Sequence, residues 1–261
     1  MLAPPPPSAP LLFNATYLVP NDTSAEAGGA DYSWDSNVGW GKGLNSANQS
    51  WMWKRHAGMD VVTFDGVSGG AWYQHGLNKV PEMIWIKDRS ATEAWQVYHK
   101  GVNGGTNPEN YEMVLNTNAA QSGGDNNLWG SGVPTATHFR TGAYDRGGAN
   151  TSHSYIAMLF ASVDGISKVG SYTAPDGAFS VNVGFQPRFL MIKRASGTGN
   201  WVVLDTTRGW GSGDDKYLRL NTTDAQADHG IGAPTSTGFN LDGYYADTGS
   251  ENSKYIYYAH A

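Results

Sequence analysis

The strongest constraint on the fold is that the chain repeats itself. The run "VPTATHF" at residues 133–139 returns as "APTSTGF" at residues 233–239, with Pro, Thr and Phe in the same order. Five landmarks recur as ordered pairs: 81–87 with 187–193, Trp95 with Trp201, 114–119 with 219–225, 133–139 with 233–239, and 155–161 with 255–261. Ordered self-similarity over this length indicates tandem structural units.

A fainter third copy stands at the front of the chain. The run "YLVPNDTSA" at residues 17–25 resembles "YLRLNTTDA" at residues 217–225, and residues 50–66 stand where a repeat would have its last strand. Half a unit cannot close its own core, so we expect it to lean on the first repeat or on another chain. The expected parts are an arm and partial repeat at 1–60, a first repeat at 61–165 and a second at 166–261.

The repeats have the patterns of strands. "MIWIK" and "FLMIK" are short apolar runs, as in strands covered on both faces. In "WQVYH" the alternation places Trp95, Val97 and His99 on one face, and "WVVLD" alternates in the same way. Because proline lacks an N–H group, we expect Pro134 and Pro234 to open their strands.

Composition favours the same fold class. The chain has 34 Gly and 12% aromatic residues, a combination typical of many short strands joined by turns. No segment has an apolar helical period sustained over three turns. The sequence therefore predicts an all-β fold of two tandem β-sandwich, jelly-roll-like repeats of about seven to ten strands each. An extended Pro-rich arm and the partial repeat precede them.

Charge and cysteine content exclude several function classes. The formal net charge is −6 and the basic residues are scattered, which argues against nucleic-acid binding. With no cysteine, neither disulfides nor thiolate metal sites can form. No apolar run approaches the roughly 20 residues that cross a bilayer, so no membrane insertion is expected.

The N-terminal run "MLAPPPPSAPLLF" lacks the basic start and long apolar core of a signal peptide. Its four consecutive prolines, residues 4–7, favour a stiff polyproline II arm. Such an arm could be a surface strap or disordered tail, or it could dock on a neighbouring subunit.

The ordered landmarks resemble a repeat module common in phage tail-fibre and tail-associated virion proteins, frequent in phages of marine bacteria and cyanobacteria. The run "WMWKRHAGMDVVTFDG" at residues 51–66 resembles the linker that often precedes such a module. The resemblance implies a structural virion component, assembled as a homo-oligomer, a trimer, and it carries over no catalytic residues. Because typical fibres are longer, it also implies a short fibre, a capsid-attached decoration or a fragment.

Catalytic and metal-binding candidates are weak. The seven histidines form neither helical pairs nor compact clusters, so we expect surface or turn positions. Carboxylates gather at Asp214 with Asp215 and at Asp224 with Asp228, where paired acids could serve glycoside hydrolysis, but loop solvation is the simpler interpretation. "DYSWDSN" and "GGDNN" offer calcium-type oxygen ligands without the EF-hand spacing. We therefore expect no enzyme activity, no cofactor and no metal site.

Tryptophans in Gly-, Asn- and Ser-rich stretches are the better candidates for contact residues. Their rings could stack on sugar faces or anchor a subunit interface, or they could cap their own sandwich. The candidate glycan or subunit contacts are Trp34, Trp40, Trp72, Trp129 and Trp210, with Trp51 and Trp53 in similar surroundings.

Taken together, these patterns and the resemblance predict a non-enzymatic structural protein of a phage virion. We expect a tail fibre or tail-associated appendage that contributes to attachment to the host surface. Its expected partners are copies of itself, neighbouring virion proteins and a host surface glycan. The alternatives are a capsid decoration protein, a carbohydrate-binding module acting through loop tryptophans, and a tailspike-type depolymerase.

Overall fold

The computed structural model describes residues 15–29, 33–36, 39–41, 51–55, 57–123, 128–211 and 213–261. Almost every element in this part of the chain is an antiparallel β-strand, so the predicted all-β, sandwich-like fold is confirmed. Within these described ranges, helical structure is limited to one short α-helix, α1 (Ala246–Gly249), and three 3-10 turns, η1 (Val102–Gly105), η2 (Pro108–Asn110) and η3 (Asp145–Gly147).

The first repeat is built on a six-stranded sheet with the strand order β10-β9-β8-β7-β12-β5. Its strands are β5 (Met59–Asp65), β7 (Met83–Asp88), β8 (Gln96–His99), β9 (Tyr111–Val114), β10 (Ser122–Gly123) and β12 (Ser154–Phe160). A two-stranded sheet of β6 (Trp72–Gln74) and β11 (His138–Arg140) covers one face.

The second repeat has a six-stranded sheet with the order β13-β21-β15-β16-β17-β18, which is the first order read in reverse. Its strands are β13 (Ser167–Thr173), β15 (Phe189–Arg194), β16 (Val202–Asp205), β17 (Asp215–Arg219), β18 (Ala227–His229) and β21 (Lys254–His260). The covering sheet has the order β14-β20-β19, with β14 (Phe179–Asn182), β19 (Gly232–Thr235) and β20 (Gly238–Leu241). Pro81 and Pro187 thus precede equivalent strands, β7 and β15.

The expectation that Pro134 and Pro234 open strands is wrong in both repeats. Pro134 lies in the loop before β11, and Pro234 lies inside β19, paired with Phe239. Strand β19 is at the edge of its sheet and has β20 as its one neighbour there, so proline can be accommodated where its missing N–H group would face the side without a partner strand.

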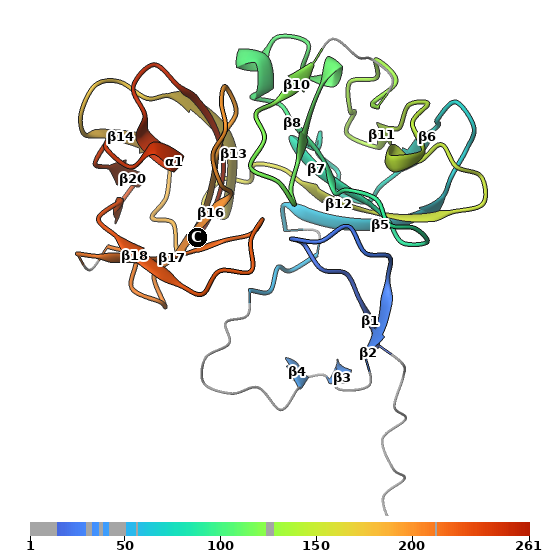
Figure 1. Cartoon of the computed structure of the whole chain (residues 1–261), viewed down its shortest axis with the longest axis horizontal. Helices are drawn as coiled ribbons and strands as arrows, with labels where there is room; N and C mark the ends of the chain where they lie inside the picture. Colours follow the sequence, from blue (N-terminus) through green and yellow to red (C-terminus); the bar gives the residue numbers. More distant parts are fainter. Residues whose placement is uncertain are drawn as a thin grey trace, which may run out of the picture.

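The two large sheets pack against each other, so each is buried on both faces (Figure 1). In β7, Met83 joins a cluster between the two repeats, whereas Ile84 and Ile86 face the covering sheet of their own repeat. Trp95 and Val97 likewise face the other repeat and Tyr98 faces the covering sheet of its own repeat, so the two sides separate as the alternation predicts. The resulting central cluster includes Met83, Trp95, Val97, Met113, Leu115, Phe160, Phe189, Met191, Trp201, Val203, Ile256 and Tyr258.

The partial repeat forms a third part beside the two sandwiches (Figure 1). It contains two hairpins, β1 (Ala15–Tyr17) with β2 (Ala27–Gly29) and β3 (Ser33–Ser36) with β4 (Gly39–Gly41). Tyr17 pairs with Ala27 in the first hairpin, as Tyr217 pairs with Ala227 between β17 and β18. The Pro-rich arm lies outside the described residues.

Each repeat has a central tryptophan, Trp95 or Trp201, directly before its fourth strand. We call the first four strands of a repeat, β5–β8 or β13–β16, its front half, and the remaining strands its rear half. The partial repeat has only rear-half elements, since β1–β2 matches β17–β18 and β3–β4 stands where β19–β20 stands. Leu18, Trp51 and Trp53 pack on the central cluster and thereby tie this half unit to both repeats.

Candidate functional site

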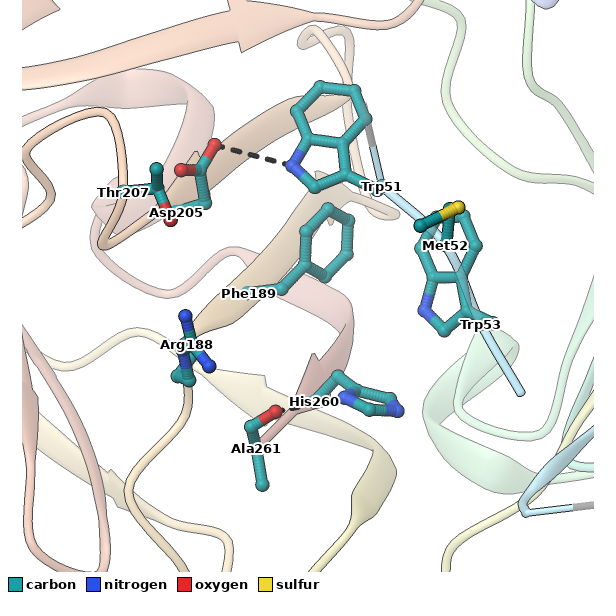
Figure 2. Close-up of a pocket in the computed structure, with 9 residues that line it drawn as sticks. All are labelled: Trp51, Met52, Trp53, Arg188, Phe189, Asp205, Thr207, His260 and Ala261. Carbon is teal, nitrogen blue, oxygen red and sulfur yellow. Dashed lines mark hydrogen bonds between the residues drawn. The ribbon is translucent and has the colours of Figure 1, made fainter. Parts of the chain in front are cut away.

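A cavity lined by aromatic rings forms where residues 51–53 cross the second repeat (Figure 2). Trp51 and Trp53 stand edge-on to Phe189, with ring centroids 5.7 Å and 5.5 Å from it. The cavity measures about 240 Å³. We call it the aromatic pocket; its lining residues are Trp51, Met52, Trp53, Arg188, Phe189, Asp205, Thr207, His260 and Ala261.

Asp205 organises the inner wall of the aromatic pocket. Its Oδ2 accepts hydrogen bonds from the Trp51 indole at 3.3 Å and from Arg208 Nε at 2.5 Å, and Oδ1 accepts the Arg208 backbone N–H at 2.9 Å. The Arg208 guanidinium also lies 5.2 Å from the Trp51 ring centroid, within cation–π range. The Asp205 carboxylate is therefore engaged in holding Trp51.

The outer wall of the pocket is polar and open to solvent. Arg188 and Thr207 are exposed, His260 is half-buried, and Met52 is 71% exposed. Ring faces beside a guanidinium and an imidazole suit a ligand that has both an apolar face and hydroxyl groups. Glycoside hydrolysis needs two carboxyl groups, and Asp205 is the only acid that lines the pocket among the described residues.

A set of contacts that occurs twice in the chain joins each repeat to the rear half of the unit before it. We call this set of contacts the module interface. The Trp95 indole donates to Val19 O at 2.9 Å, and the equivalent Trp201 indole donates to Val114 O at 3.0 Å. Val19 and Val114 occupy the same position of their hairpins, because β1–β2 and β9–β10 share one register. The same indole bond therefore joins the partial repeat to repeat one and repeat one to repeat two.

Two backbone bonds accompany each indole bond. The Glu93 N–H donates to Thr23 O, as Gly199 N–H donates to Asn118 O, both at 2.9 Å. In the opposite direction, the N–H of Glu26 bonds to Arg89 O and the N–H of Gln121 to Ala195 O, again both at 2.9 Å. Three matched bonds at two places show that the interface is head-to-tail, with different surfaces on its two sides.

Buried lysines reinforce these loops. Lys193 Nζ donates to Arg194 O at 2.6 Å and, across the module interface, to Ala119 O at 2.8 Å. Burial lowers the pKa of Lys193 to about 8, and burial also lowers the pKa of the equivalent Lys87. A buried lysine with a lowered pKa can be a catalytic base, but both ammonium groups are engaged with backbone carbonyls, so their role here is structural.

His99 joins the two repeats. Its Nδ1 accepts the Gly101 N–H at 2.9 Å, so the ring proton is on Nε2, which faces Tyr257 O of the second repeat at 3.3 Å. Burial lowers its pKa to about 4, which keeps the imidazole neutral at pH 7.

A family model described as a domain of unknown function, DUF7483, matches residues 24–261. The chain belongs to this family. The DUF7483 match begins between β1 and β2 and spans both repeats, so the family unit takes in both sandwiches and the docked rear half together. No curated protein and no solved structure matches the chain.

The tryptophans predicted as contacts in this DUF7483 chain differ in how exposed they are. Trp72 is 48% exposed in β6, with the Arg140 guanidinium 5.9 Å from its ring centroid. Trp129 and Trp210 are only 2% and 3% exposed, so the prediction that they contact a glycan or subunit is wrong for both. Their Gly-rich loops fold inward, and the rings fill the outer cores of their own sandwiches.

Trp34 and Trp40 lie in β3 and β4, but their side chains are outside the described part of the structure. When β3–β4 is aligned with β19–β20, the position of Trp40 corresponds to that of Phe239, which is fully buried in the core of its own repeat. The contact roles of Trp34 and Trp40 therefore stay predictions. The pocket residues Trp51 and Trp53 carried no sequence signal for the pocket, because repeat equivalence does not reveal which unit they contact.

The acidic candidates also have structural roles. Asp215 is 1% exposed and accepts the backbone N–H groups of Gly211, Ile231 and Gly232, so it is neither solvated nor free for catalysis. Asp224 pairs with Arg219 at 3.3 Å. Among the described residues no group of three or more His, Cys, Asp or Glu could hold a metal ion, and both calcium-type stretches fall partly outside that range. No helix in the described ranges is long and apolar enough to span a membrane.

Proposed function

We propose that this chain is a non-enzymatic structural component of a phage virion, a tail fibre or tail-associated appendage that contributes to attachment to the host surface. The resemblance of the ordered landmarks to tail-fibre modules motivates the virion assignment. The observation that carries the structural role is the module interface, which is used twice in one chain with the same three bonds.

A shared core favours a mechanical role. The central cluster joins both repeats and the partial repeat, so the parts cannot rotate freely about linkers. The buried ionisable groups Asp60, Asp88, Lys193, Asp205 and Asp215 are all occupied by partners within the fold. A shared core whose buried carboxylates and lysine are held by other parts of the fold supports a load-carrying part better than it supports catalysis.

Immunogold labelling of purified particles, together with mass spectrometry of their proteins, tests this proposal. We expect label on the tail. We also expect the number of copies per particle to be a multiple of three, because each closed trimer contains three copies. Label spread over the head would replace the fibre with a capsid decoration protein. Absence of the chain from purified particles would contradict the virion role.

Glycan binding is the second candidate, and the aromatic pocket favours it. Trp51, Trp53 and Phe189 supply ring faces, and Arg188 supplies an exposed hydrogen-bond donor at the rim. A glycan array on the full chain, repeated with Arg188→Ala and with Trp72→Ala, would locate the site. Loss of binding in Arg188→Ala alone points to the pocket, loss in Trp72→Ala alone points to the exposed tryptophan of β6, and no binding at all refutes this candidate.

A further inference from the structure

The hairpin of β17 and β18 has the same docking edge as the two hairpins that are already occupied. Tyr217 pairs with Ala227 as Glu112 pairs with Ser122, so Arg219 O, Thr223 O and Gln226 N stand where Val114 O, Asn118 O and Gln121 N stand in repeat one. Within the described residues, no group of another unit bonds to any of these three atoms.

Burial agrees with an uncovered edge. Leu115 of repeat one is fully buried, whereas its counterpart Leu220 is only partly buried. Gln121 and Glu26 are half-buried under the units docked on them, but Gln226 is exposed, and Ala225 is exposed where its counterpart Ala120 is half-buried. The second repeat thus presents to solvent a surface that the first repeat and the partial repeat use for docking.

A second, independent observation comes from the partial repeat. In each complete repeat an asparagine side chain accepts the backbone N–H of the central tryptophan: Asn116 Oδ1 from Trp95 and Asn221 Oδ1 from Trp201, both at 2.9 Å. The equivalent residue of the partial repeat is Asn21, which has no such tryptophan in its own half unit.

Asn21 lies next to the uncovered edge. Its Nδ2 donates to Thr222 O at 3.0 Å, three residues along the chain from Arg219. Within the described residues, its Oδ1 accepts no hydrogen bond. A single incoming tryptophan could therefore donate its backbone N–H to Asn21 Oδ1 and its indole N–H to Arg219 O, which is the pair of bonds that Trp95 and Trp201 each make.

We propose that the edge formed by Asn21, Arg219, Thr223 and Gln226 binds the front half of another module of this type, carried by a separate polypeptide chain. The partner's strands would complete the partial repeat, its tryptophan would bridge Asn21 and Arg219, and its loop backbone would bond to Thr223 O and Gln226 N. This inference concerns the chemistry of the edge and does not depend on the virion assignment.

Other occupants fit the edge less well. A second copy of this chain offers no spare front half, because Trp95 and Trp201 already donate to Val19 and Val114 of their own chain. The chain's own residues 1–14 contain no tryptophan, and the five prolines at residues 4–7 and 10 have no N–H group.

Backbone hydrogen exchange tests the edge in the native chain first. The Glu26 and Gln121 amides serve as internal references, since both are bonded across an occupied interface. We expect the Gln226 amide to exchange about tenfold or more faster than these two. Equal protection at Gln226 would mean that the edge is already covered, and it would overturn the proposal.

The second arm supplies a surrogate partner. A second copy of residues 59–109, the front half of repeat one and its link to β9, is joined to Ala15 in place of residues 1–14. We expect Gln226 to gain protection comparable to that of Gln121, and we expect the gain to be lost when the added copy carries phenylalanine at its Trp95 position. An added copy that leaves Gln226 unprotected overturns the proposal, because the same segment folds against an equivalent edge in the native chain. Protection that survives the Trp95→Phe change overturns the indole recognition.

Discussion

Acid should loosen the contact between the two repeats through His99. At neutral pH its Nδ1 accepts the Gly101 N–H and its Nε2–H faces Tyr257 O at 3.3 Å, so the neutral ring satisfies both neighbours. Protonation would put a second N–H at Nδ1, opposite another N–H group, and would charge a ring that has no exposed surface. The perturbation is therefore a fall in pH from 7 to about 4.5.

The magnitude follows from the shift in pKa. Burial, which is the largest cause, lowers the pKa of His99 from 6.5 to about 4 in the folded protein. Between these values the unfolded chain binds more protons than the folded one, so the free energy of unfolding falls as the pH falls from 6.5 towards 4. Complete loss corresponds to about 3 kcal/mol.

Urea unfolding at pH 7 and at pH 4.5 measures the effect. His99→Gln keeps an uncharged donor facing Tyr257, so we expect this variant to start less stable and to lose less stability on acidification. Burial also lowers the pKa of His75, but the difference between the two proteins cancels that contribution. Identical pH dependence in the parent and in His99→Gln would refute this account of the interface.

Three further substitutions test separate parts of the fold by urea or thermal unfolding. Asp215→Ala removes the acceptor for three backbone N–H groups, of which that of Ile231 is buried, and should cost about 3 kcal/mol; an unchanged midpoint would show that water replaces the carboxylate. Asp205→Asn leaves the Arg208 guanidinium buried without its counter-charge, so we expect a loss of about 3 kcal/mol and altered Trp51 fluorescence, and unchanged fluorescence would contradict the contact. In Gly238→Ala the new Cβ would lie 2.0 Å from a carbonyl of β14, so the covering sheet should open; Gly28→Ala meets nothing within 4 Å and is the control.

Much of the fold could be predicted because the repeat consists of packing positions. The "MIWIK" and "FLMIK" runs predicted strands covered on both faces, and alternation correctly separated Val97 from Tyr98. The sequence did not say what covers the second face. An apolar side chain reports that it is buried, but it does not identify its neighbour, so the direct packing of the two large sheets could not be foreseen.

The candidate site was harder to predict because exposure was inferred from composition. Trp129 and Trp210 stand in Gly-rich loops, and these loops turn into the core, where the Trp129 indole bonds to Tyr111 O. Asp215 was similarly judged by its residue type, although three backbone donors surround it. In both cases the deciding contacts are between residues distant in sequence, which no local pattern encodes.

The head-to-tail character of the module interface has a consequence for how such proteins can lengthen. Each complete repeat carries the indole on one side and the receiving carbonyl on the other, so a gene segment that encodes one repeat can be copied in tandem without a new contact surface having to arise. A rear-half hairpin alone, as in β1 and β2, already holds the surface on which the next unit docks.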